Sequence, residues 1–312
     1  MGKSVMGWQG ASHAASAKPT LSSPMRWLLL LLLAFAHRTC AFMSMSASPR
    51  GLPAGMTRDI TWSNPQGLDL TPICPNVWGA ERPFYFLSLD VGGRMAVIKL
   101  GDGSLWIHSP VDLDDDLRKA LAEIGPVKHI VSPNYEHLKW APQWIEAFPD
   151  AESYGCPGVL EKKPDVKWKH SIGDSTPACW PEEIEPLWLD CETVPFSDKP
   201  FFNEVLFFHK PTKSLLVTDA YWNYPRSMTR LRDRFWKWAM DVIYLNPVYR
   251  GLMVDKQKMA KCLEAVNGWD VERIIPCHGH IVNAKAKEAF LRQVRDGVLT
   301  TPSMMAESFI SQ

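Results

Sequence analysis

From residue 59 onward, the pattern of hydrophobic and polar positions predicts a series of strands and helices. Apolar runs or alternating apolar positions indicate strands, and apolar residues recurring every three or four positions indicate helices. Strands are expected at 94–100, 104–107, 127–131, 151–154, 184–189, 204–209, 214–218 and 273–276. Helices are expected at 112–124, 138–148, 226–245, 254–266 and 284–298. The proline-rich stretch 59–82 is expected to form a loop or short edge pieces.

Two turns predict β-hairpins. The first is Gly101-Asp102-Gly103 between two apolar runs, and the second covers residues 210–213. The order along the chain is strands, then alternating helix and strand, a hairpin, helices, and a final strand and helix. This order is typical of a mixed α/β domain with its sheet inside and its helices outside.

The first 58 residues have the pattern of a targeting leader. Residues 1–24 contain no acid, and Met25-Arg26 precedes an apolar run at 27–36 that is too short to span a bilayer, which takes about twenty residues. Small residues follow, so a signal peptide is expected at about 25–41, with Met25 as an alternative start. Residues 42–58 are rich in serine and alanine and lack acids, like a transit segment. We therefore expect a leader and disordered linker at 1–58, one folded domain at 59–312, and entry into the secretory route, with a plastid in a secondary-plastid alga or secretion as the destination.

Charge and cysteine usage exclude several classes of protein. Lys plus Arg and Asp plus Glu number 34 each, so the charge gives no reason to expect a nucleic-acid partner. The seven cysteines form no C-x-x-C pair, which argues against a disulfide scaffold or zinc ribbon and leaves open one bridge such as Cys179 to Cys191. The chain contains neither the serine-hydrolase nor the nucleotide-binding glycine motifs.

Four segments together carry a family resemblance: 102–111, 131–137 (VSPNYEH), 204–219 and 273–280 (RIIPCHGH). In this order and spacing they resemble the metallo-β-lactamase superfamily. More narrowly, they resemble an uncharacterised domain-of-unknown-function subfamily found in bacteria and photosynthetic organisms. The resemblance covers roughly residues 60–297. It implies an αββα four-layer sandwich of class α/β (α+β), in which two mixed sheets pack face to face with helices outside.

The resemblance also implies a metal site that has lost part of its ligand set. The family motif H-x-H-x-D-H corresponds to residues 132–137, where Ser132 and Asn134 replace two histidines, Glu136 replaces the aspartate and His137 is retained. Pro200 is the nearest match to the next histidine of the family. The remaining candidate ligands are Glu136, His137, Asp219 and His278, with His108 and His280 as supplementary candidates. These residues could hold one divalent ion, zinc first, iron or manganese as alternatives, or none.

Each candidate also has a structural interpretation. His137 could cap the helix at 138–148, and Glu136 could favour the same N-terminus through the helix dipole. Asp219 and His278 could hydrogen-bond loop backbone groups. Cys277, beside His278, could be a soft ligand, a reactive thiol or a small buried residue.

Two functions remain open. One is a mononuclear metal-dependent hydrolase that cleaves an ester, thioester or amide, with Glu136 as ligand or general base. The other is a non-catalytic member of the fold that binds a small molecule or a partner in the old cleft. A third, weaker interpretation is a peripheral membrane protein that uses the basic, aromatic segment 226–245. The alternative for that segment is a helix over the sandwich with its aromatic face buried and its arginines in water, which apolar residues on more than one face favour.

Overall fold

The computed structural model describes residues 61–86, 89–173, 180, 182–225, 228 and 231–295. Residues 56–312 form a compact unit, and the hydrophobic clusters of its core lie within that unit. The described residues do not include the predicted signal peptide at 25–41, the predicted transit segment at 42–58 or Cys179. The two segments stay predictions. Among the described residues, no helix is both long and apolar enough to cross a lipid bilayer.

The larger sheet has seven strands in the order β1-β2-β5-β6-β7-β8-β9. In this order, neighbouring strands from β1 through β6 pair antiparallel. Neighbouring strands from β6 through β9 pair parallel. Its strands are β1 (Leu70–Cys74), β2 (Val77–Arg82), β5 (Gly93–Lys99), β6 (Leu105–His108), β7 (Val127–Ser132), β8 (Glu152–Gly155) and β9 (His170–Ser171).

The second sheet has four strands in the order β10-β11-β12-β13, namely β10 (Ile184–Trp188), β11 (Val205–His209), β12 (Ser214–Val217) and β13 (Arg273–Pro276). Its first three strands are antiparallel, and β12 and β13 are parallel. A small separate hairpin consists of β3 (Tyr85–Phe86) and β4 (Leu89–Asp90). Both predicted hairpins are confirmed, because β5 pairs with β6 and β11 pairs with β12.

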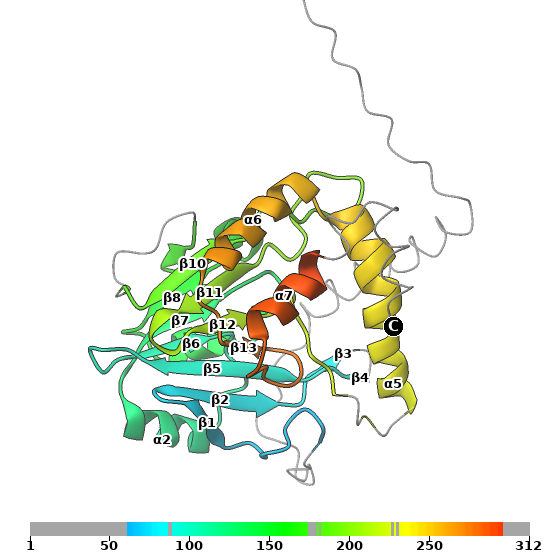
Figure 1. Ribbon diagram of the computed structural model, residues 1–312. Coiled ribbons are helices and arrows are strands. Elements are labelled where there is room, and N and C mark those ends of the chain that lie inside the picture. Colours follow the sequence, from blue (N-terminus) through cyan, green and yellow to red (C-terminus); the bar gives the residue numbers. More distant parts are fainter. Residues whose placement is uncertain are drawn as a thin grey trace, which may run out of the picture. The chain divides into compact units, whose positions relative to one another are not determined.

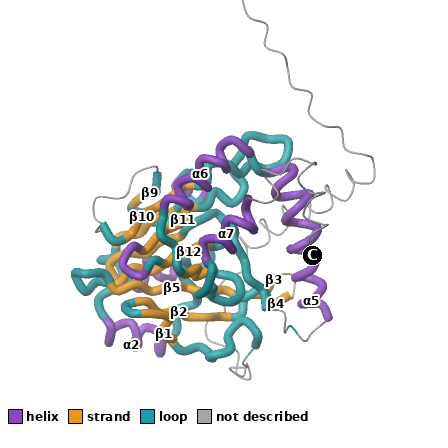
Figure 2. Tube along the Cα trace, viewed as in Figure 1, coloured by secondary structure: helices purple, strands orange, loops and turns teal. Residues whose placement is uncertain are grey.

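Helices cover the outer faces of both sheets (Figures 1 and 2). The α-helices are α2 (Asp115–Ile124), α3 (Ala141–Ala147), α4 (Val159–Lys162), α5 (Leu231–Trp238), α6 (Lys256–Gly268) and α7 (Ala286–Arg295). A 3-10 turn, η1 (Lys210–Thr212), joins β11 to β12, and a π-helix, η2 (Ala239–Met253), continues α5.

The alternation of side chains along the strands produces the layers. Trp106 and Phe207 point between the two sheets, where their ring centroids are 5.1 Å apart. Their neighbours Leu105 and Ile107 point the other way and pack with α2 and α3, while Leu206 and Phe208 pack with α6 and α7. Strand residues buried on both faces need a helix layer on each outer face. The expected αββα sandwich is therefore confirmed.

The prediction for residues 59–82 was confirmed for the described residues up to β1 and wrong for β2. Residues 61–69 form a loop with turns, and β1 is a short edge strand. β2 pairs with β1 across a register shift and lies inside the sheet between β1 and β5. Pro72 is tolerated because β1 is an edge strand, where a missing N–H costs no ladder hydrogen bond. Asn76 turns the chain with a φ of 62°.

Two predicted helices begin later than expected. α2 begins at Asp115 because the Asp114 side chain accepts from the Leu117 N–H and caps the helix. α3 begins at Ala141 with Trp140 as its N-cap and no side-chain capping bond, so the interpretation of His137 as the cap of this helix was wrong.

Candidate metal centre

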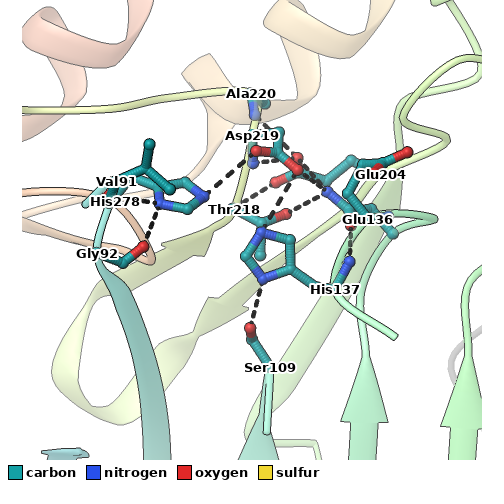
Figure 3. Close-up of polar contacts among 11 residues, drawn as sticks. Val91, Gly92, Ser109, Glu136, His137, Glu204, Thr218, Asp219, Ala220 and His278 are labelled. Carbon is teal, nitrogen blue, oxygen red and sulfur yellow. Dashed lines mark hydrogen bonds and ion pairs between the residues drawn. The ribbon is translucent and has the colours of Figure 1, made fainter. Parts of the chain in front are cut away.

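Three of the candidate residues lie together on loops that follow strands (Figure 3). His137 follows β7 of the larger sheet, whereas Asp219 and His278 follow the parallel strands β12 and β13 of the second. The carboxyl ends of parallel strands meet at one edge of a sheet, which brings the last two side chains together. The candidate ligand atoms of His137, Asp219 and His278 all lie within 4.8 Å of one another.

The orientation of His278 is set by the loop that follows β4. Its Nδ1 lies 2.8 Å from the Gly92 carbonyl oxygen and 3.2 Å from that of Val91. A carbonyl oxygen only accepts, so Nδ1 carries a proton and Nε2 is the ring atom that faces Asp219. That Nε2 lies 3.4 Å from Asp219 Oδ1, which is an acceptor. The contact is satisfied either by a proton on Nε2 or by a cation between the two atoms, and a divalent metal ion fits there.

His137 approaches the other oxygen of the same carboxylate. Its Nε2 lies 3.4 Å from Asp219 Oδ2, and its Nδ1 lies 2.7 Å from the Ser109 hydroxyl. The Cys277 side chain also hydrogen-bonds His137. A metal-binding histidine is typically held in this way through its second nitrogen.

The three groups also depend on one another electrostatically. Burial alone would raise the pKa of Asp219, but the two neighbouring imidazoles outweigh burial and hold the pKa well below its usual range. Burial alone would lower the pKa of His137, yet the charge of Asp219 raises it well above its usual value. A buried anion between two imidazoles attracts either a proton or a metal ion.

Asn134 connects the loops at this site, although it stands where the family has a histidine. Its Nδ2 donates to Asp219 Oδ2 at 2.6 Å and to Thr218 Oγ1 at 2.9 Å. Its Oδ1 accepts from the backbone N–H groups of Glu136 and His137, at 3.0 and 2.9 Å. Asn134 thus links the β7 loop to the β12 loop without coordinating a metal.

Glu204 holds the loop that carries Asp219. It is fully buried, and its carboxylate accepts the backbone N–H groups of Thr218, Asp219 and Ala220 at 2.6, 2.7 and 2.8 Å. Burial and the nearby charge of Asp219 raise its pKa, while the N–H donors oppose this rise. These contacts fix the backbone of the loop, and with it the Asp219 side chain.

Two glycines allow the loops to approach closely. Gly279 has a φ of 89°, and a Cβ there would lie 2.1 Å from the Asn223 carbonyl oxygen. Gly92 has a φ of 68°, and a Cβ there would lie 2.9 Å from the Ser63 Cβ. These positions favour glycine because a side chain would displace the loop backbones that present and orient His278.

The other sequence candidates lie outside the group of three. Glu136 keeps part of its surface in solvent, yet the loss of hydration beside the neighbouring loops, and then the charge of Asp219, raise its pKa. His280 is exposed, Pro200 is exposed beside Thr193, and Cys277 is buried. His108 is 1% exposed and stacks on Trp106 within the core between the sheets.

Burial of His108 predicts a sensitivity to acid. Burial lowers the pKa of His108 to about 3, and its Nε2 has no partner among the described residues. Below pH about 6.5, His108 becomes protonated in the unfolded chain but stays neutral in the folded chain. The free energy of unfolding therefore decreases as the pH falls. We expect a loss of about 2 kcal/mol from this residue between pH 7 and pH 5.

Urea unfolding of the parent and of His108→Phe at both pH values measures this effect. His209, whose pKa burial lowers to about 4, is present in both proteins and so cancels in the comparison. An equal loss of stability in the two proteins would contradict the assignment.

Sequence reasoning missed Glu204, Asn134 and Ser109. The sequence offered a reason to consider Asn134, because the resemblance aligns it with a ligand position of the superfamily motif. It offered none for Glu204, since an acid that precedes an apolar strand is usually solvated.

Comparisons with known proteins agree with this geometry. The solved structure of the DIM-1 metallo-β-lactamase exposed to ceftazidime is 14% identical, with a TM-score of 0.50, over 74% of this chain and 96% of that one. TMB-1 is 12% identical, with a TM-score of 0.50, over 73% and 97%. The metal-soaked Flv1 flavodiiron core from Synechocystis sp. PCC6803 is 10% identical, with a TM-score of 0.50, over 74% and 60%. A search of curated proteins found no match.

At these identities the structural likeness establishes the fold alone, and the fold is that of the metallo-β-lactamases. A family model for a domain of unknown function matches residues 75–234, which is about half of the chain. This protein therefore belongs to the DUF4336 family.

Proposed function

We propose that the chain binds one divalent metal ion through His137 Nε2, Asp219 and His278 Nε2. The observation that carries this proposal is that both Nε2 atoms lie 3.4 Å from the one Asp219 carboxylate, while the Gly92 carbonyl oxygen holds His278 through its other nitrogen. Two imidazoles and one carboxylate form a ligand set that zinc accepts, and that iron(II) and manganese(II) also accept. Zinc is our first choice.

We propose further that the bound ion serves hydrolysis of an ester, thioester or amide. Such an ion polarises a carbonyl oxygen and lowers the pKa of water toward neutrality. Asp219 holds the two imidazoles in position, Asn134 and Glu204 hold Asp219, and the exposed Glu136 carboxylate, with its raised pKa, accepts a proton. Each role rests on a contact or a charge already described.

A panel of chromogenic esters, thioesters and amides tests this function. The zinc-, manganese- or iron-loaded protein is expected to turn over at least one class, and His137→Ala/His278→Ala is expected to lower kcat/KM by at least about a hundred-fold. His170→Ala is the matched control, because His170, on β9, is exposed and pairs with Glu152 of β8. A folded, metal-loaded parent without turnover of any class would refute the hydrolase.

One observation favours the non-catalytic alternative. Asn134 donates to Asp219 Oδ2, so one oxygen of the central carboxylate is partly occupied by a protein group. A metal-loaded but inactive protein would therefore be a binding protein that uses the ion for structure or for ligand contact.

A further inference from the structure

Helix α5 presents a stripe of large apolar side chains to solvent. Leu231, Phe235, Trp238 and Val242 are 78%, 62%, 49% and 48% exposed. Their spacing of four, three and four residues places them on one face of the helix and its continuation. The rings of Phe235 and Trp238 lie 5.6 Å apart. We call these four residues the α5 stripe.

The opposite face of the helix packs against the protein, which keeps the α5 stripe exposed to solvent. Asp233 is buried, and Trp236, Met240 and Tyr244 pack against a cluster that contains Trp222 and Tyr224. Figure 1 shows α5 at the edge of the molecule, beside β3 and β4. The prediction of a buried aromatic face is therefore confirmed for Trp236 and Tyr244 and wrong for Phe235 and Trp238.

Basic side chains flank the stripe. Arg232 and Arg234 are exposed, and at 3.6 residues per turn they lie on opposite sides of Leu231 and Phe235. The acids nearby are engaged within the protein: Asp241 binds Lys237 at 2.5 Å, and Asp233 is buried with its Oδ1 3.8 Å from Arg232 Nε. The Arg232 side chain is still 50% exposed. The outward face of α5 therefore combines an apolar centre with basic edges.

We propose that α5 docks on an anionic lipid bilayer, with the α5 stripe entering the interface and Arg232 and Arg234 contacting lipid phosphates. An apolar strip with tryptophan, phenylalanine and leucine between arginines is the arrangement of interfacial helices. The arginines supply the charge complementarity to anionic headgroups. The proposal does not depend on the metal site, although the Tyr224 ring of the supporting cluster lies 6.5 Å from that of His278.

Vesicle co-sedimentation tests the docking. Residues 56–312 are used because they form a compact unit with its own core, and because the apolar run at 27–36 would bind vesicles by itself. The parent is expected to sediment with phosphatidylcholine vesicles that contain phosphatidylglycerol, and much less with phosphatidylcholine alone. Phe235→Ser/Trp238→Ser is expected to lower the partition coefficient by at least about ten-fold. Arg232→Gln/Arg234→Gln is expected to remove the preference for the anionic vesicles.

Phe196→Ser is the matched control, since Phe196 is 66% exposed and lies outside α5. It is expected to bind vesicles like the parent, and circular dichroism verifies that each variant is folded. Absence of parent sedimentation, or equal losses in Phe196→Ser and Phe235→Ser/Trp238→Ser, would overturn the proposal. A parent dimer that becomes monomeric in Phe235→Ser/Trp238→Ser, without vesicle binding, would instead assign the stripe to a second copy of the chain.

Discussion

Replacing Glu204 by leucine is expected to lower the free energy of unfolding by about 4 kcal/mol or more. Three backbone N–H groups, of Thr218, Asp219 and Ala220, depend on this one buried carboxylate. Leucine accepts no hydrogen bond, so these donors would stay buried without partners. Urea unfolding monitored by circular dichroism measures the difference.

Glu272→Gln is the control for this experiment. Glu272 has a 63% exposed side chain and pairs with Lys213, so its replacement is expected to cost less than about 1 kcal/mol. If Glu204→Leu and Glu272→Gln unfolded at the same urea concentration, Glu204 would not be the residue that holds the Asp219 loop.

The sequence predicted those elements whose hydrophobic pattern is local and complete. β13 has the predicted bounds because the apolar pair Ile274 and Ile275 is bounded by Arg273 and Pro276. β2 was missed because the prolines before it, Pro72 and Pro75, resemble loop residues, and only the position of β1 at the sheet edge makes Pro72 acceptable. Whether a strand lies at an edge depends on its pairing partners, which the local sequence does not specify.

The candidate ligands could be found by resemblance, but their supports could not. The resemblance gave His137, Asp219 and His278 as candidate ligands, and these three residues lie together. Asn134 binds Asp219, which is 85 positions away, and Glu204 binds the backbone of a loop 14 to 16 positions away. The Asn134 contact depends on how the two sheets pack, and the Glu204 contacts depend on the pairing of β11 with β12. A motif encodes neither.

The sequence also did not predict which face of α5 is exposed to solvent. Its apolar residues fall on more than one side, so periodicity alone did not say which side is buried. The packing of Trp236 against the cluster around Trp222 decides the question and leaves Phe235 and Trp238 in solvent.

Removal of both imidazoles is expected to abolish metal binding. His137→Ala/His278→Ala leaves only Asp219 of the three groups that lie within 4.8 Å. One carboxylate, already bonded to Asn134, is too poor a site to retain zinc through purification. His170→Ala keeps all three groups and is expected to bind like the parent.

Metal content is the measurement that tests the central claim most directly. Residues 56–312 are purified without a histidine tag, supplied with zinc, desalted and analysed by mass spectrometry for bound metals. We predict about one ion per chain in the parent and in His170→Ala, and none in folded His137→Ala/His278→Ala. No bound metal in a folded parent, or equal metal in His137→Ala/His278→Ala, would contradict the metal site.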